Sequence, residues 1–278
     1  MKKINASITA VGSFLPQTVL SNLDLEKIVD TNDEWITSRT GIKERRILDK
    51  GIGTSYMAIN AAKAIIEEKK INPLEIDLVI VATITPDMHA TATAAFVASK
   101  IGATNAFGFD INAACSGFLY GMSTASAFIE SGRYKKILLI GADKMSSIVD
   151  YTDRNTCIIF GDGAGAVLIE PNSEGLGVQD EYLRSDGNNR DLLRIEAGGS
   201  QTPITVEAVN EKKHFIYQDG KNVFKHAVSN MADASEKIMT RNGLNNTDIN
   251  FLVAHQANKR IIDATSNRMG IVDEKVLK

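Results

Sequence analysis

The segment most informative about the architecture is Ile71-Asn-Pro-Leu-Glu-Ile-Asp-Leu-Val-Ile-Val-Ala82. Its last five residues, Leu78–Ala82, form a continuous apolar run, which is typical of a strand buried on both faces of a sheet. The pair Asn72-Pro73 breaks the chain before that strand. Amphipathic helices are predicted on both sides, at Ser55–Lys70 and at Thr91–Ile101. A strand between two helices indicates a layered α/β fold.

A second copy of this pattern begins 173 residues later, at Leu244-Asn-Asn-Thr-Asp-Ile-Asn-Phe-Leu-Val-Ala-His255. It also lies between two predicted helices, Val223–Arg241 and Lys259–Met269. Such an internal repeat predicts two related α/β halves. We therefore expect one half over residues 1–173 and another over residues 174–278. The counterpart of Cys115 would fall beyond Lys278, so we expect the second half to be incomplete at its C-terminus.

The rest of the chain continues the alternation of strands and helices, and its composition excludes several classes of protein. Further strands are predicted at Ile4–Val11, Ala106–Ile111, Lys136–Ile140, Ile158–Phe160 and Ala164–Ile169, and further helices at Asp24–Val29 and Gly117–Glu130. Hydrophobic residues make up 44% of the 278 residues and charged residues 23%, as in globular proteins. The net charge is −3 and no run of charged residues exceeds four, which argues against a nucleic-acid partner. No apolar stretch approaches the length of a membrane span, and the two cysteines are too few for a disulfide framework, so we expect a cytoplasmic protein.

The strongest local signal for chemistry is Asp110-Ile-Asn-Ala-Ala-Cys-Ser-Gly-Phe-Leu119. Cys115 lies between a predicted strand and the first turn of a predicted helix. Unpaired backbone N–H groups and the helix dipole at such a turn favour a thiolate. Small neighbours, among them Ala114 and Gly117, leave a substrate room to approach the sulfur. This pattern indicates a nucleophile, although a buried structural cysteine remains the alternative.

A nucleophilic cysteine needs a partner, and the chain has four histidines. His255 ends a predicted buried strand at a strand-to-helix turn, and residues in that position face the ligand crevice of α/β sheets. His226 lies within a predicted helix, where a polar residue on the helix face is the simpler interpretation. His89 and His214 fall in loops and receive no role. A pairing of Cys115 with His255 would suit covalent catalysis.

Four motifs occur in the order found in one family: Trp35-Ile-Thr-Ser-Arg-Thr-Gly-Ile42, Asp110–Leu119, Gly161-Asp-Gly-Ala-Gly-Ala166 and His255-Gln-Ala-Asn258. Over residues 4–273 the chain resembles β-ketoacyl-acyl carrier protein synthase III, a condensing enzyme of the thiolase superfamily. The resemblance implies a duplicated, five-layered αβαβα fold and a homodimer. It implies no metal and no cofactor, because acyl-CoA is a substrate. The glycine-rich motif precedes a strand pattern and not a helix, so we interpret it as close packing and not as a phosphate cradle.

The resemblance also assigns roles to individual positions. Cys115 matches the nucleophile, His255 the catalytic histidine, and Asn258 a substrate-binding neighbour in the same motif. Trp35 and Arg154 match residues that enclose the adenine of CoA. The other matches are Arg39 near the CoA phosphates, Phe224 in the tunnel, Thr91 in the primer pocket, and Lys221, Lys225, Lys259 and Arg260 on a basic rim that would dock the acidic acyl carrier protein.

The implied reaction joins an acyl-CoA primer to malonyl-acyl carrier protein at the start of type II fatty acid synthesis. Thr91 stands where members restricted to acetyl primers carry Phe, so longer or branched primers are expected. The family's Gly-Asn-Thr motif, whose Asn is its third catalytic residue, is absent from these 278 residues. This absence keeps open a truncated, non-catalytic homologue that dimerises or binds the carrier. A specialised condensing enzyme is a further alternative, but hydroxymethylglutaryl-CoA synthase needs a Glu acid and Thr83–Phe96 offers only Asp87.

Overall fold

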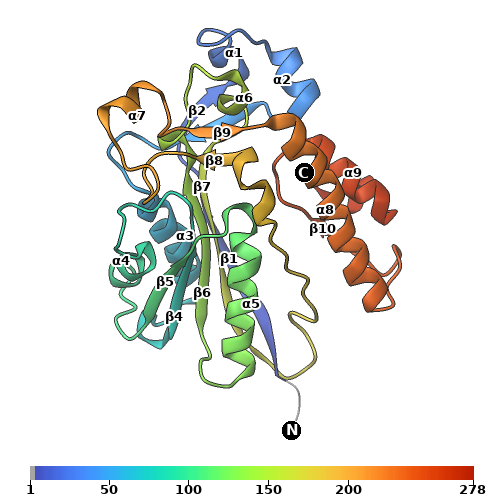
Figure 1. Ribbon diagram of the computed structural model, residues 1–278. Coiled ribbons are helices and arrows are strands. Elements are labelled where there is room, and N and C mark those ends of the chain that lie inside the picture. Colours follow the sequence, from blue (N-terminus) through green and yellow to red (C-terminus); the bar gives the residue numbers. More distant parts are fainter. Residues whose placement is uncertain (1–3) are drawn as a thin grey trace. The chain divides into compact units, whose positions relative to one another are not determined.

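The computed structural model describes residues 4–278, which form two compact units (Figure 1). Unit 1 contains the described residues up to Thr18 together with Arg46–Ser147 and Gly161–Glu181. Unit 2 contains Val19–Arg45, Ile148–Phe160 and Tyr182–Lys278. These units differ from the predicted halves, because Val19–Arg45 and Ile148–Phe160, from the first 173 residues, group with the C-terminal part of the chain.

Unit 1 is built on a five-stranded sheet. Its order is β1 (Asn5–Phe14), β7 (Asp162–Asn172), β6 (Ile137–Lys144), β4 (Leu78–Ala82) and β5 (Phe107–Ile111). The neighbours β6, β4 and β5 run parallel, whereas β7 is antiparallel to both β1 and β6. The carboxyl ends of β4 and β5 therefore meet at one edge of the sheet.

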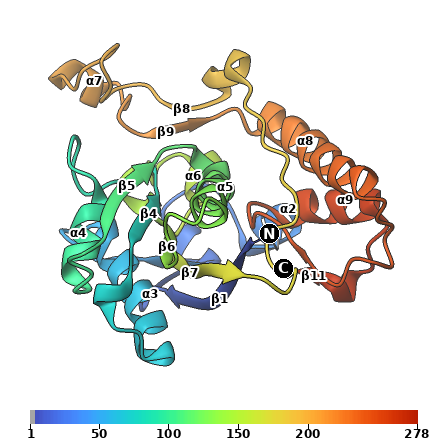
Figure 2. The same cartoon turned by 90° about the horizontal axis from the view of Figure 1, so that it is seen from below.

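Helices cover both faces of this sheet. The side chains of Val79 and Val81 belong to a core shared with α3 (Thr54–Lys69) and α4 (Thr93–Lys100). Leu78 and Ile80 belong to a second core shared with α5 (Gly117–Glu130). Figures 1 and 2 show α5 on one side of the sheet and α3 on the other. All five residues of β4 are buried, which confirms the strand predicted from its apolar run.

Unit 2 is mainly helical. Its helices are α1 (Asn22–Leu25), α2 (Asp33–Thr40), α6 (Arg154–Cys157), α7 (Val206–Asn210), α8 (Gly220–Arg241) and α9 (Lys259–Met269). Two-stranded sheets join β8 (Leu193–Ile195) to β9 (Ile216–Gln218) and β10 (Leu252–Val253) to β11 (Val276–Leu277). A third two-stranded sheet joins β2 (Thr18–Ser21) to β3 (Glu44–Ile47), and only part of each strand belongs to unit 2. The pair β10 and β11 is parallel. Within residues 4–278 no helix is both long and apolar enough to cross a membrane.

The two segments of the internal repeat fold alike in their local details. Lys70 and Gly243, 173 residues apart, both lie just after a helix in the left-handed conformation, with φ of 52° and 64°. The residue after each donates its N–H back to the helix, at 3.0 Å from Ile71 to the carbonyl of Ile66 and at 2.9 Å in the second copy. Asn72 then accepts from the N–H two residues ahead, and Asn245 does the same. These matching bonds support the predicted repeat.

Two predicted strands differ from the structure. The residues predicted as the strand Ile158–Phe160 follow the short helix α6 without forming one, and Cys157, expected to lie just before it, ends that helix. The predicted buried strand before His255 is only the two-residue β10, and Val253 is 73% exposed. Its one neighbour in the described chain is β11, so there is no second strand or helix layer to bury its outer face.

The glycine-rich motif opens strand β7, as its pattern predicts. The buried carboxylate of Asp162 accepts hydrogen bonds from the backbone N–H of Leu48 and from both the N–H and the hydroxyl of Ser146. A Cβ on Gly163 would lie 3.3 Å from Leu15, whereas one on Gly165 would meet open space. The predicted close packing therefore holds at Gly163 and is wrong for Gly165. Asp162 ties three segments of unit 1 together.

Candidate active site

The predicted nucleophile lies on a constrained turn at the edge of the sheet. Strand β5 leads into Ala114, whose φ of 45° is left-handed and strained for a residue with a side chain. Cys115 follows in the short 3₁₀ turn Ala114–Ser116, directly before α5, and is exposed. A Cβ on Gly117 would lie 3.1 Å from the Cβ of Ala82, so the glycine lets α5 approach the end of β4. The predicted strand-to-helix position of Cys115 is confirmed.

The electrostatic environment of this thiol differs from the sequence-based expectation. Although Cys115 has solvent-exposed surface, the protein atoms around its sulfur partly desolvate it and raise the pKa of Cys115, and the nearby Asp143 carboxylate raises it further. The N–H of Cys115 itself acts in the opposite direction and is the smaller effect. The expected preference for a thiolate is therefore wrong for the resting molecule, because desolvation and a like charge outweigh the N–H groups at the helix start. The thiol is neutral until a substrate or a base takes its proton.

Asp143 ends β6 and organises the loop after β4. Its Oδ1 accepts hydrogen bonds from the hydroxyl of Thr83 at 2.9 Å and from the N–H of Ile84 at 2.8 Å. The same oxygen accepts from the N–H and the hydroxyl of Thr85, at 3.3 and 3.0 Å. Burial raises the pKa of Asp143, and these hydrogen bonds oppose the shift. No role was predicted for Asp143, although a carboxylate at the carboxyl end of a parallel strand is a recognisable signal in the sequence.

A second carboxylate holds the predicted primer loop. Thr91 is exposed and follows Ala90, which adopts a left-handed φ of 70°. Directly after this loop, α4 begins without a side-chain cap of its own. Asp110 supplies one from β5: its two oxygens accept from the N–H groups of Thr93 and Ala94, at 2.7 and 2.8 Å. The strand that leads to Cys115 therefore also anchors the loop that carries Thr91.

The predicted catalytic histidine belongs to unit 2, whereas Cys115 belongs to unit 1. His255 follows β10 and has solvent-exposed surface, but the protein atoms around its ring partly desolvate it and lower the pKa of the imidazole below its ordinary value. The imidazole is thus neutral at pH 7. Asn258, predicted to contact substrate, caps α9: its Oδ1 accepts from the N–H of Arg260 at 2.9 Å.

Unit 2 brings together the residues predicted to bind the CoA nucleotide. Trp35 lies on α2, which Asn32 caps by accepting the N–H of Trp35 at 2.8 Å. The guanidinium carbon of Arg154 lies 5.2 Å from the Trp35 ring centroid, and that of Arg39 lies 5.6 Å from it. Arg154 also donates to the carbonyl of Asp30 at 2.9 Å. Three residues named from the sequence thus share one aromatic and cationic cluster.

The residues predicted to form the basic rim lie on two helices that pack against each other, α8 and α9. Arg260 lies over the ring of Phe224, with its guanidinium carbon 4.9 Å from the centroid. Lys259 forms an ion pair with Asp263 at 2.5 Å and packs its stem where a Cβ on Gly41 would lie. The two remaining members, Lys221 and Lys225, are one helical turn apart on α8.

Comparison with known proteins gives a consistent result. Residues 109–187 match the family model of 3-oxoacyl-[acyl-carrier-protein (ACP)] synthase III, and residues 239–278 match the model of its C-terminal part. Beta-ketoacyl-[acyl-carrier-protein] synthase III 2 of Bacteroides thetaiotaomicron is 54% identical over all of this chain and 83% of its own length. The corresponding protein of Chlorobium phaeobacteroides is 56% identical over 98% of this chain and 84% of its own.

Comparison with solved structures points to the same family. The crystal structure of 3-oxoacyl-[acyl-carrier-protein] synthase III from Aquifex aeolicus is 40% identical, with a TM-score of 0.89 over 98% of this chain and 83% of that one. The fold and the cysteine turn thus place the chain among the condensing enzymes with a thiolase-like α/β fold. Within that class, it belongs to the β-ketoacyl-acyl carrier protein synthase III family. These matches do not establish the incomplete second half expected above.

Proposed function

We propose that this protein condenses an acyl-CoA primer with malonyl-acyl carrier protein, giving β-ketoacyl-acyl carrier protein, CoA and carbon dioxide, at the start of type II fatty acid synthesis. The observation that carries the proposal is Cys115 on the strained turn between β5 and α5. Strong identity to proteins named for the same synthase activity supports it.

In the first half-reaction, the Cys115 sulfur attacks the thioester carbon of the acyl-CoA. The bond from carbon to the CoA sulfur breaks, and CoA leaves as a thiol with the proton that Cys115 releases. Because the resting thiol is neutral, this proton must move as the new bond forms. The backbone N–H of Cys115 would stabilise the negative oxygen of the tetrahedral intermediate.

In the second half-reaction, the malonyl group loses carbon dioxide, and the electron pair of the broken bond forms an enolate. The enolate carbon attacks the acyl carbon on Cys115, and the cysteine sulfur leaves. His255 would donate an N–H to the enolate oxygen as its charge develops. A neutral imidazole suits this task, because it retains one N–H and does not depend on acidic pH.

The CoA adenine would bind between Trp35 and Arg154. A flat base between two flat groups needs about 7 Å, that is two contacts of about 3.5 Å. The present spacing is 5.2 Å, so the guanidinium must swing outward to admit the base. The Arg154 side chain is 48% exposed and has room to move. Binding thus exchanges one exposed cation–π contact for stacking on both faces of the adenine.

Acyl carrier protein is the proposed macromolecular partner, and it would dock on the rim of Lys221, Lys225, Lys259 and Arg260. An acidic carrier meeting a basic rim should associate in a salt-sensitive way. Charge reversal at Lys225 and Arg260 should raise the KM for malonyl-acyl carrier protein and spare Cys115 acylation by acyl-CoA. Lys63→Glu, an exposed position on α3, is the matched control. A KM for malonyl-acyl carrier protein that changes neither with salt nor with charge reversal would contradict the docking site.

We also propose that the protein works as a homodimer in the cytoplasm. Strand β5 lies at the end of the five-stranded sheet, and Phe107 on that strand is 43% exposed. An unpaired strand edge with an exposed aromatic residue favours association with another chain. Phe107→Glu should shift the mass in solution from dimer to monomer, and an unchanged mass would argue against this edge. Two free cysteines are consistent with a reducing compartment.

The activity is tested by incubating the protein with acetyl-CoA and locating the acyl group by mass spectrometry. One acyl group should appear on Cys115 and none on Cys157, which is buried and whose pKa burial raises to about 11. Addition of malonyl-acyl carrier protein should then release carbon dioxide and the β-ketoacyl product. Cys157→Ser should behave as wild type. Acylation of Cys157, or none at all, would favour the non-catalytic alternative.

A further inference from the structure

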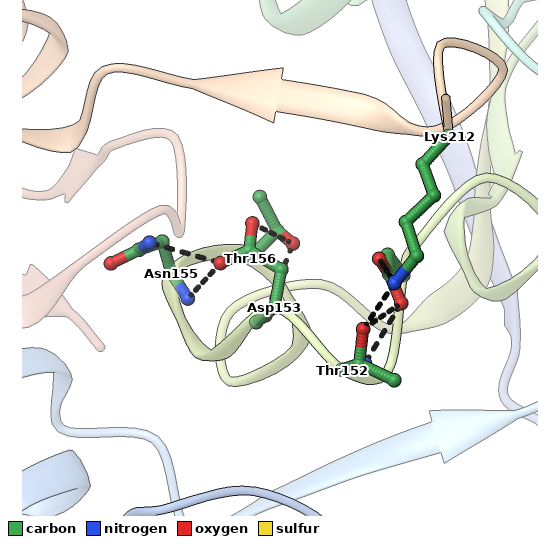
Figure 3. Close-up of polar contacts among 6 residues, drawn as sticks. Thr152, Asp153, Asn155, Thr156 and Lys212 are labelled. Carbon is green, nitrogen blue, oxygen red and sulfur yellow. Dashed lines mark hydrogen bonds and ion pairs between the residues drawn. The ribbon is translucent and has the colours of Figure 1, made fainter. Parts of the chain in front are cut away.

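The turn that carries Arg154 is held by two carboxylates. The carbonyl of Asp150 accepts the N–H of Asp153 at 3.0 Å, and the Asp150 Oδ1 accepts from the N–H and hydroxyl of Thr152, at 2.9 and 2.8 Å. Asp153 caps α6, because its Oδ1 accepts from the N–H of Asn155 at 2.9 Å. Its Oδ2 accepts from the hydroxyl of Thr156 at 3.1 Å (Figure 3). The backbone at Arg154 therefore lies between two ordered turns.

A lysine from a distant part of the chain closes this arrangement. Figure 3 shows the Lys212 side chain extending to Thr152. The Lys212 Nζ donates to Asp150 Oδ2 at 2.8 Å and to the Thr152 hydroxyl at 2.6 Å. A second link joins the same segments, from the N–H of Ile216 to the carbonyl of Ile148 at 2.8 Å. The backbone of Lys212 has a left-handed φ of 59°, which a residue with a side chain rarely adopts.

The negative charge of the Asp150 carboxylate explains why the contact needs the ammonium group of Lys212. The Asp150 side chain is only 14% exposed, and its burial would by itself raise the pKa of the carboxyl. Hydrogen bonds from Lys212 and Thr152 outweigh that effect, so the pKa of Asp150 lies below its ordinary value. Without the ammonium group, Asp150 would keep its charge in a poorly hydrated place with only the Thr152 bonds. Rearrangement of the turn toward water would then relieve the carboxylate, and Arg154 would move with it.

We propose that Lys212 is a positioning residue for acyl-CoA, which acts through Asp150 and the turn to hold the backbone of Arg154 in reach of Trp35. The Lys212 ammonium group is engaged by Asp150 and Thr152 and does not itself contact the nucleotide. The exposed Arg154 side chain swings out to admit the adenine. The anchored backbone keeps the position from which that side chain extends unchanged. This role rests on the nucleotide site of the proposed function.

The test compares two thioester substrates that share a reactive group, acetyl-CoA and acetyl-pantetheine, which lacks the nucleotide. Lys212→Met should raise the KM for acetyl-CoA about 3- to 10-fold, as expected for loss of a partly buried ion pair. The kcat and the KM for acetyl-pantetheine should stay within twofold of wild type. Lys212→Arg should restore most of the affinity, because it keeps the charge. Lys213→Met is the matched control, since the neighbouring Lys213 pairs with Glu196 and Glu211 instead.

A second readout is direct, because Trp35 is the only tryptophan in the chain. Quenching of its fluorescence by CoA should give a weaker Kd in Lys212→Met and an unchanged Kd in Lys213→Met. Equal increases in KM for both thioesters would show a general structural defect and overturn the positioning role, and so would an unchanged KM for acetyl-CoA. If wild type uses both thioesters equally well and CoA leaves Trp35 unquenched, the nucleotide site itself is wrong and the positioning role fails with it.

Discussion

Removing the Trp35 ring should weaken CoA binding by a magnitude that the geometry allows us to estimate. Stacking of a base on an aromatic side chain contributes about 1–3 kcal/mol by alanine substitution. Trp35→Ala should therefore raise the Kd for CoA roughly 5- to 150-fold, since 1.36 kcal/mol corresponds to a factor of ten. Arg154→Ala should have a smaller effect. That variant loses one stacking surface, but it also no longer has to break the cation–π contact with Trp35, worth about 0.5–1 kcal/mol at an exposed site.

Isothermal titration of CoA into the two single variants and the double variant measures this ordering. The double-mutant cycle should show coupling, because both side chains contact the same base. Tyr217→Ala is a control of the same kind, because Arg194 lies 4.6 Å from the Tyr217 ring centroid and neither residue belongs to the proposed site. A Trp35→Ala effect below twofold, or a Tyr217→Ala effect of equal size, would refute adenine stacking at Trp35.

Substitutions at His255, Asp143 and Thr91 give four further testable outcomes. His255→Ala should slow malonyl decarboxylation by about 10²–10³ and leave Cys115 acylation measurable; rates equal to wild type would exclude the role. Because burial lowers the pKa of His255, the unfolded chain takes up a proton first as the pH falls through the ordinary imidazole value. Acid titrations of stability should accordingly show a steeper loss for wild type than for His255→Ala. Asp143→Asn keeps the accepting Oδ1 and removes the charge, so the pKa of Cys115 should fall. Iodoacetamide should then alkylate Cys115 faster at pH 8 than in wild type, and slower alkylation would contradict the effect of Asp143. Thr91→Phe should lower kcat/KM for isobutyryl- and octanoyl-CoA relative to acetyl-CoA, by about fourfold for each methylene excluded from the pocket; an unchanged ranking would remove Thr91 as the determinant of primer length.

Local patterns in the sequence were sufficient for much of the fold. The apolar run of β4 and the helical periodicity of α5 and α9 predict the observed bounds of all three elements, because each pattern lies within one element and reports which of its faces is buried. The strand predicted at Ile158–Phe160 failed for the opposite reason. Ile158 is buried and Ile159 and Phe160 are half-buried, and burial alone does not distinguish a strand from the residues that follow a short helix.

The candidate site likewise has features that the sequence predicted and features that only the tertiary structure decided. The sequence was enough to place Cys115 at a strand-to-helix turn, because that position depends on neighbouring residues. Trp35 and Arg154 were named through the resemblance to the family and not through a pattern of their own. The state of the thiol depended on the tertiary structure, which brings Asp143 near Cys115 from another strand and partly desolvates the sulfur. The same holds for Lys212, which reaches Asp150 across 62 residues of chain. Burial and long-range charge depend on which distant segments meet, and a local pattern contains no record of that.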